Sequence, residues 1–180
     1  RTMIEQEPNH SSVAARLLLD NLRAEGLSFL NVAESATQGD MATYYPQALK
    51  SFISRGIELE LLAPNLADYD LDMLGEALLP ERDLQFSYLG LQTLYDRYFI
   101  HSDETRFELP QLFFMRVAMG LAMREDEKNA RAIEFYQLLS SFDYMSSTPT
   151  LFNSGTLRPQ LSSCYLTTVP DDLHGIYGAI

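Results

Sequence analysis

Residues 109–124 are apolar on nearly every side, and this run constrains the fold more than any other segment. Its apolar side chains include Leu112, Phe113, Phe114, Val117, Met119 and Leu121. A helix that is apolar all round is stable only when other elements bury it from several directions. The sequence therefore predicts a central buried helix surrounded by further helices.

Amphipathic spacing predicts the surrounding helices. Apolar residues recur at helical intervals in the ranges 10–26, 43–56, 71–79, 86–95 and 126–142. We expect Gly26 and Gly56 to end the first two, and Pro46 to lie in the first turn of the second. Asp70 is expected to cap the third, and Asp126-Glu127 to open the last.

Two short stretches of strand character interrupt this helical plan. Residues 98–100 and 105–107 flank His101–Glu104, which predicts a short hairpin. After Ser146 the chain becomes rich in turns, and Leu161–Val169 has the composition of a β-strand. Asp171-Asp172 is then expected to cap a last helix.

Composition limits the classes of function. The chain has 180 residues and a formal net charge of −12, which argues against a nucleic-acid partner. No run approaches the roughly 18 apolar residues of a membrane span, so we expect no membrane partner. One cysteine cannot form an internal disulfide, and we expect a cytoplasmic protein. Because Arg1 precedes Met3 and the sequence stops in an apolar run, we interpret it as a piece of a longer polypeptide.

Metal sites find little support in the sequence. Asp68, Asp70 and Asp72 have the spacing of a calcium loop, but Met73 stands where such a loop requires glycine. The three histidines are far apart and lack the spacing of zinc ligands. We therefore predict no metal ligand in this chain.

The single cysteine, Cys164, allows two interpretations. It follows two serines and starts an apolar run, so it fits a small buried side chain in a strand. The alternative is that the Cys164 thiol and the Thr148 and Ser163 hydroxyls face one polar ligand. Spacing alone leaves both open.

At this tract the chain resembles the large, catalytic subunit of class I ribonucleotide reductase. The matching elements are Thr148-Pro149, Asn153-Ser154-Gly155, Arg158, Ser162-Ser163-Cys164 and Asp171-Asp172-Leu173. The resemblance continues upstream through Phe86-Ser87-Tyr88. It implies a mainly α fold, an all-helical N-terminal domain with a short hairpin that leads into the first strand of a ten-stranded α/β barrel. Residues 1–26 would be a remnant of ATP-cone helices, 27–146 the all-α domain and 147–180 the start of the barrel.

The resemblance also implies a chemistry. The family reduces ribonucleoside diphosphates by thiyl-radical chemistry, and Cys164 would be one of two redox cysteines whose partner lies beyond Ile180. Thr148, Ser163 and Cys164 match substrate-contacting positions. Asp171, Asp172 and Leu173 match a tract that contacts the specificity effector, a deoxynucleoside triphosphate or ATP.

The resemblance implies partners outside this chain. These are a metal-containing small subunit that supplies the radical, thioredoxin or glutaredoxin as reductant, and a second large subunit in a homodimer. We expect the piece alone to bind no cofactor and to be inactive. Arg23 is followed by Ala24 where ATP-binding members often have Lys, so we assign no nucleotide binding to residues 1–26.

Two alternatives remain at this stage. One is a non-catalytic, acidic helical interaction module with a structural cysteine. The other is a glycyl-radical or cobalamin-dependent reductase, which shares the barrel. The helical domain and the remnant of the cone favour class I over that second alternative.

Overall fold

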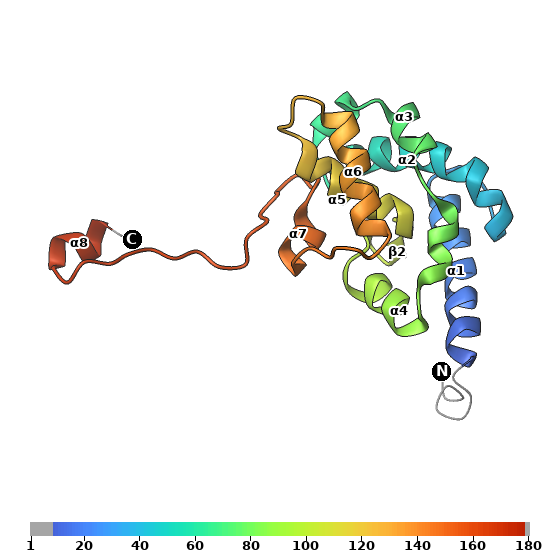
Figure 1. Cartoon of the computed structure of the whole chain (residues 1–180), viewed down its shortest axis with the longest axis horizontal. Coiled ribbons are helices and arrows are strands. Elements are labelled where there is room, and N and C mark those ends of the chain that lie inside the picture. Colours follow the sequence, from blue (N-terminus) through green and yellow to red (C-terminus); the bar gives the residue numbers. More distant parts are fainter. Residues whose placement is uncertain (1–8, 179–180) are drawn as a thin grey trace.

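Helix α5 (Pro110–Ala122) lies at the centre of the helical body, as predicted. The computed structural model describes residues 9–178, and within it every residue from Pro110 to Met119 is buried. Helices α2 and α6, the 3₁₀ turn η3 and the short helix α7 all pack on α5. Figure 1 shows α5 and α6 side by side in the middle of this body.

The shell of the body consists of helices joined by 3₁₀ turns. The helices are α1 (His10–Phe29), α2 (Met41–Glu58), α3 (Leu71–Glu76), α4 (Tyr88–Arg97) and α6 (Lys128–Ser140). The turns are η1 (Gln38–Asp40), η2 (Pro64–Asp68) and η3 (Pro80–Gln85). The described chain is mainly helical, as predicted, and one apolar core joins α1 to α6.

Two helices extend beyond the glycines that were expected to end them. Helix α1 continues to Phe29 and α2 to Glu58. A Cβ atom at Gly26 would lie 3.1 Å from the Leu109 side chain, and one at Gly56 would lie 2.4 Å from that of Leu62. Both glycines therefore serve close packing, and the prediction that they stop the helices was wrong.

The expected place of Pro46 was also wrong. Helix α2 begins at Met41, so Pro46 lies inside the helix and not in its first turn. Gly75 of α3 packs directly on it, since a Cβ atom at Gly75 would lie 3.0 Å from Pro46 Cα. The proline thus forms part of the contact between α2 and α3.

The predicted cap and hairpin are confirmed. Asp70 Oδ1 accepts a hydrogen bond of 3.0 Å from the Met73 backbone N–H at the start of α3. Strand β1 (His101–Ser102) pairs antiparallel with β2 (Thr105–Arg106), so the hairpin forms, but its first strand lies in the expected turn and not at residues 98–100. Helix α6 begins directly after Asp126-Glu127, where the negative charges favour a helix start.

The chain leaves the body after α7 (Thr148–Asn153) as an extended segment that ends in α8 (Leu173–Gly178) (Figure 1). We call residues 161–178 the tail. The strand predicted over Leu161–Val169 is not formed, and the described residues show no barrel. A strand needs a neighbour to accept and donate its backbone hydrogen bonds, and this segment has none among the described residues.

The expected domain boundaries are untested, but the first falls inside a helix. Residues 1–8 of the predicted ATP-cone remnant lie outside the described residues. Helix α1 runs through position 26, and its Leu19 and Leu22 belong to the common core. Across residues 9–178, no helix is both long and apolar enough to cross a membrane.

Candidate functional site

The predicted site residue Thr148 lies at the first position of α7, a six-residue helix fixed at both ends. Ser147 before it is extended and Pro149 occupies the first turn, where its missing N–H costs no hydrogen bond. The helix ends at Asn153, Ser154 after it is extended, and Gly155 follows with φ of +75°, a conformation that favours glycine. The Asn153-Ser154-Gly155 motif therefore forms the turn that ends α7.

This turn lies directly against α5. A Cβ atom at Gly120 of α5 would be 2.2 Å from the Gly155 nitrogen, so the two glycines let the backbones meet. Ser154 Oγ donates a 2.7 Å hydrogen bond to the Val117 carbonyl, and the Ala63 N–H donates to the Gly155 carbonyl at 3.0 Å. The end of α7 is thus held by hydrogen bonds as well as by packing.

A buried arginine holds the carbonyl end of α7. The Arg116 guanidinium donates to the carbonyls of Leu151 (3.2 Å) and Ser154 (2.6 Å). It also pairs with the Glu108 carboxylate at 2.6 Å, and both side chains are fully buried. A cation at the carbonyl end of a helix is electrostatically favourable. Glu108 Oε2 in turn accepts from the Ile100 N–H at 2.9 Å, which links α7 to the hairpin.

Tyr98 contacts α7 near both of its ends. Its ring stacks on Phe152 of α7 with centroids 4.6 Å apart and an interplanar angle of 16°. Its hydroxyl lies 3.2 Å from Thr148 Oγ1, within hydrogen-bond distance. Thr148 itself is exposed, so its hydroxyl also remains open to a ligand.

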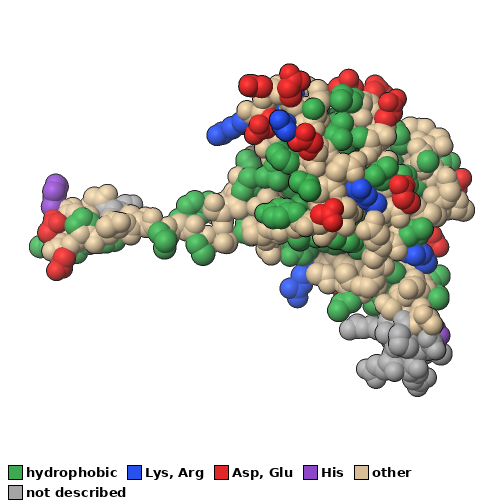
Figure 2. Space-filling model, viewed as in Figure 1, with side chains coloured by type: hydrophobic (Ala, Val, Ile, Leu, Met, Phe, Trp, Pro, Cys, Tyr) green, Lys and Arg blue, Asp and Glu red, His purple; other side chains and the backbone are tan. Residues whose placement is uncertain are grey.

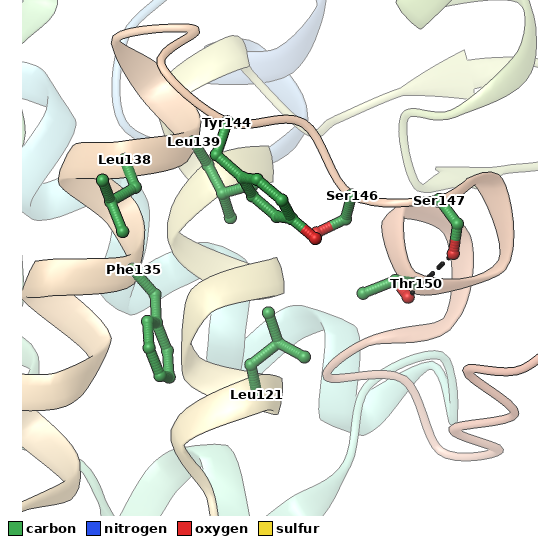
Figure 3. A pocket seen from close by; sticks show the side chains of 8 residues that line it. All are labelled: Leu121, Phe135, Leu138, Leu139, Tyr144, Ser146, Ser147 and Thr150. Carbon is green, nitrogen blue, oxygen red and sulfur yellow. Dashed lines mark hydrogen bonds between the residues drawn. The ribbon is translucent and has the colours of Figure 1, made fainter.

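A pocket of about 460 Å³ lies beside α7 (Figure 3). Four apolar side chains of α5 and α6 form one wall, and Tyr144, Ser146, Ser147 and Thr150 form the other. Ser147 Oγ and Thr150 Oγ1 are 3.3 Å apart, joined by the dashed line in Figure 3. The pocket has the size of a small-molecule site and places hydroxyls at one end, but Thr148 is not among its lining residues.

The other predicted site residues lie on the tail and are not brought to Thr148. Ser163 and Cys164 are exposed, and neither makes a hydrogen bond to any described residue. Figure 1 shows this segment leading away from the body. Cys164 is thus exposed in this chain, and its role as a redox thiol or as a structural cysteine stays a prediction.

The three residues matched to an effector tract lie at the start of α8. Asp172 Oδ1 accepts from the Gly175 N–H at 2.8 Å, which confirms the predicted cap. Leu173 is 76% exposed and Asp171 is also exposed. This arrangement leaves Asp171 and Leu173 open to a ligand.

Sequence reasoning missed a buried polar cluster between α1, α2 and α5. The Asp83 carboxylate accepts hydrogen bonds from Tyr45 (2.8 Å), Gln111 (2.8 Å) and Arg23 (3.1 Å). Burial raises the pKa of Asp83, and the hydrogen bond from Gln111, the charge of Arg23 and the hydrogen bond from Tyr45 oppose that rise. Burial and the neighbouring Asp83 charge raise the pKa of Tyr45 well above its usual value.

The sequence contains a hint of the two buried polar clusters, one around Asp83 and one around Arg116. Gln111 and Arg116 are polar residues inside an otherwise apolar helix, and a buried cation needs a paired partner. What sequence could not supply was the partner, since Asp83 lies 28 positions from Gln111. These groups stabilise the scaffold and lie away from the exposed thiol.

The described residues contain no group of three or more His, Cys, Asp or Glu side chains that could hold a metal ion. Asp72 of the supposed calcium loop instead forms an exposed ion pair with Lys50 at 2.5 Å. Asp70 is engaged in capping α3, as described above. Asp70 and Asp72 therefore have structural partners.

Comparison with known proteins places residues 84–159 in the family described as ribonucleotide reductase, all-alpha domain. Over its full length the chain is 51% identical to the ribonucleoside-diphosphate reductase subunit alpha of Chlamydia muridarum. It is 40% identical to the Helicobacter pylori subunit alpha over 94% of the chain, and 34% identical to the Schizosaccharomyces pombe large chain over 99%. The chain spans only 17%, 20% and 21% of these three relatives.

Proposed function

The chain belongs to the family of ribonucleotide reductase large subunits, and we propose that the whole protein reduces ribonucleoside diphosphates to deoxyribonucleotides for DNA synthesis. The observation that carries this proposal is the similarity, over the full chain, to large subunits named for that activity. The chain would contribute the all-helical domain and the first redox thiol, with class I radical chemistry supplied by the rest of the enzyme.

The reaction exchanges the ribose 2′-hydroxyl for hydrogen. The C–O bond at C2′ breaks, a C–H bond forms, and the oxygen leaves as water. Two thiols supply the two electrons and two protons and become a disulfide. The disulfide is then reduced by exchange with an external dithiol, thioredoxin or glutaredoxin.

Cys164 is our candidate for one of these two thiols. The thiol is exposed and free, so a second thiol has access to it. The sequence contains one cysteine, so the partner must come from a part of the protein outside this chain. The extended backbone around Cys164 makes that approach sterically open.

Thr148 and Ser163 are proposed to bind the substrate diphosphate or ribose. Thr148 supports this role because its exposed hydroxyl sits on a helix held at both ends. Ser163 precedes Cys164 and would bring its hydroxyl to the same ligand. The proposal requires the tail to fold back toward α7 in the whole protein.

Residues 161–169 would form the first barrel strand once neighbouring strands are present. Their exposed side chains include Tyr165, Leu166 and Val169, which a barrel would cover. Asp171, Asp172 and Leu173 would then contact a nucleotide effector, ATP or a deoxynucleoside triphosphate. The Asp171 carboxylate would accept a hydrogen bond from the ribose of the effector.

The remaining parts of the proposal concern the partner proteins and the cellular location. A metal-containing small subunit would supply the radical, and two large subunits would form a dimer. Residues 1–26 would belong to an ATP cone, and the enzyme would act in the cytoplasm. The chain by itself would be inactive, because it lacks the second thiol.

The test is Cys164→Ser in the full-length enzyme, assayed with small subunit, reductant and ribonucleoside diphosphate. We expect sustained turnover to stop while the substrate Kd stays unchanged, because the hydroxyl keeps the size of the thiol but not its redox chemistry. Thr167→Ser, a change on the same exposed segment, is the control and should retain activity. Normal multiple turnover by Cys164→Ser would refute the assignment.

A further inference from the structure

We infer that Tyr98 is a positioning residue for substrate binding, acting through the hydroxyl of Thr148. The inference rests on the proposed function and adds to it a residue of the helical body. The contact that carries it joins Tyr98 Oη and Thr148 Oγ1 at 3.2 Å across 50 positions of sequence. No other described side chain hydrogen-bonds the Thr148 hydroxyl.

The Tyr98 ring is fixed from two sides. It stacks on Phe152 of α7, and it meets Phe113 of α5 edge-on at 6.4 Å and 77°. A tyrosine ring has two side-chain torsions, so two aromatic contacts leave its hydroxyl little freedom. The hydroxyl is therefore directed at Thr148 before any ligand arrives.

Helix α7 is equally fixed relative to Tyr98. Arg116 holds its carbonyl end through the Leu151 and Ser154 carbonyls, and Glu108 holds Arg116. Because the carbonyl end of this short helix is attached to buried groups and its Phe152 stacks on the Tyr98 ring, the helix keeps Thr148 beside the Tyr98 hydroxyl. The Tyr98–Thr148 contact is thus part of a rigid unit.

Hydrogen-bond direction gives the contact its chemical meaning. A threonine hydroxyl has one proton and two acceptor lone pairs. A diphosphate presents only acceptor oxygens, so Thr148 must donate its proton to bind one. Tyr98 is then the donor to the Thr148 oxygen, and its O–H fixes the Thr148 proton in the direction of the ligand.

This arrangement reduces the entropy lost on binding. A free hydroxyl rotor must be ordered when the substrate binds, whereas one already held by Tyr98 is in place. Removing the Tyr98 hydroxyl should therefore weaken substrate binding and leave the chemical step alone. The expected size is that of one hydrogen bond, about threefold to tenfold in KM.

The experiment is a double-mutant cycle in the full-length large subunit, assayed with its small subunit and reductant at saturating effector. Tyr98→Phe keeps the stacked ring and should raise the KM for ribonucleoside diphosphate about threefold to tenfold, with kcat unchanged. Thr148→Val should raise KM at least as much, and adding Tyr98→Phe to it should have no further effect. Tyr88→Phe is the matched control, because that hydroxyl bonds Gln92 on the same helix and should not alter KM.

A conservative variant guards against a purely structural effect. Thr148→Ser keeps the hydroxyl, so KM should stay near the wild-type value and Tyr98→Phe should still raise it in that background. Additive effects of Tyr98→Phe and Thr148→Val would overturn the inference, as would an unchanged KM for Tyr98→Phe in an active enzyme. Absence of ribonucleotide reduction by the wild-type holoenzyme would instead overturn the proposed function, and the inference with it.

Discussion

The helical body and the tail differ in what determines their structure. The body buries a continuous core, from Leu19 of α1 to Leu139 of α6, and pairs the buried charges of Arg23 with Asp83 and of Arg116 with Glu108. On the tail, side chains from Ser162 to Leu173 are all exposed, including apolar ones (Figure 2). The proposed redox thiol, Cys164, is nevertheless on the tail.

This difference shows which part of the structure the residues of this chain can form by themselves. The body has enough apolar surface to fold by its own packing. The tail has strand-like sequence but nothing to pair with, so its backbone is extended without being part of a sheet. We conclude that the helical body is specified by residues of this chain, whereas the redox segment needs the rest of the protein to form its strand.

The largest effect we expect in the body comes from Arg116→Met. Removing the guanidinium leaves Glu108 buried without its partner and frees two carbonyls at the end of α7. Breaking a buried ion pair from one side costs about 3–5 kcal/mol in the free energy of unfolding. Urea denaturation followed by circular dichroism measures this loss.

Two further variants sharpen that result. Arg131→Met removes an exposed ion pair with Glu134 and should change stability far less. Glu108→Leu combined with Arg116→Met removes both charges and should recover part of the loss. If Arg116→Met unfolded at the wild-type urea concentration, α7 would not be held in the way described.

A second, smaller effect should come from Gly120→Ala. The new methyl would meet the Gly155 nitrogen at 2.2 Å, and backbone atoms cannot move aside as a flexible side chain can. We expect a loss of about 1–3 kcal/mol in the free energy of unfolding, typical of overpacking. Thermal denaturation would detect it.

The matched change on the tail is Gly178→Ala. Apart from its chain neighbours, no atom of the described residues lies within 4 Å of the added methyl, so the free energy of unfolding should not fall. Equal losses for the two alanines would mean that the tail packs as tightly as the body. That result would remove the contrast between the two regions.

Sequence patterns were sufficient to predict features that depend on residues close together in the sequence. The apolar run of α5, the Asp70 cap and the hairpin at 101–106 were predicted because periodicity, capping and turn composition are local signals. Glycine was misread twice, because Gly26 and Gly56 contact side chains that only the tertiary fold brings to them.

The sequence motif identified candidate site residues, but it did not predict how they are arranged in space. Thr148, Ser163 and Cys164 were chosen from the motif, and whether they bind substrate stays a prediction. Arg116 could have been suspected as a polar residue in an apolar helix, but its contacts with the α7 carbonyls and the Tyr98–Thr148 contact join residues 35 to 50 positions apart and could not be found from the sequence. The strand over residues 161–169 failed for the related reason that β-structure depends on a neighbour.

The smallest effect should be found on the tail itself, with Cys164→Ser and Leu166→Ala. Leu166 is fully exposed and Cys164 is exposed and unpaired, so neither change removes buried surface or leaves a buried group without a partner. We expect the free energy of unfolding of this chain to stay within about 0.5 kcal/mol of wild type. This measurement is needed to interpret the turnover experiment. If Cys164→Ser stops turnover while the helical body stays as stable as wild type, the loss is due to the missing thiol and not to unfolding. A loss of several kcal/mol would instead return Cys164 to a structural role.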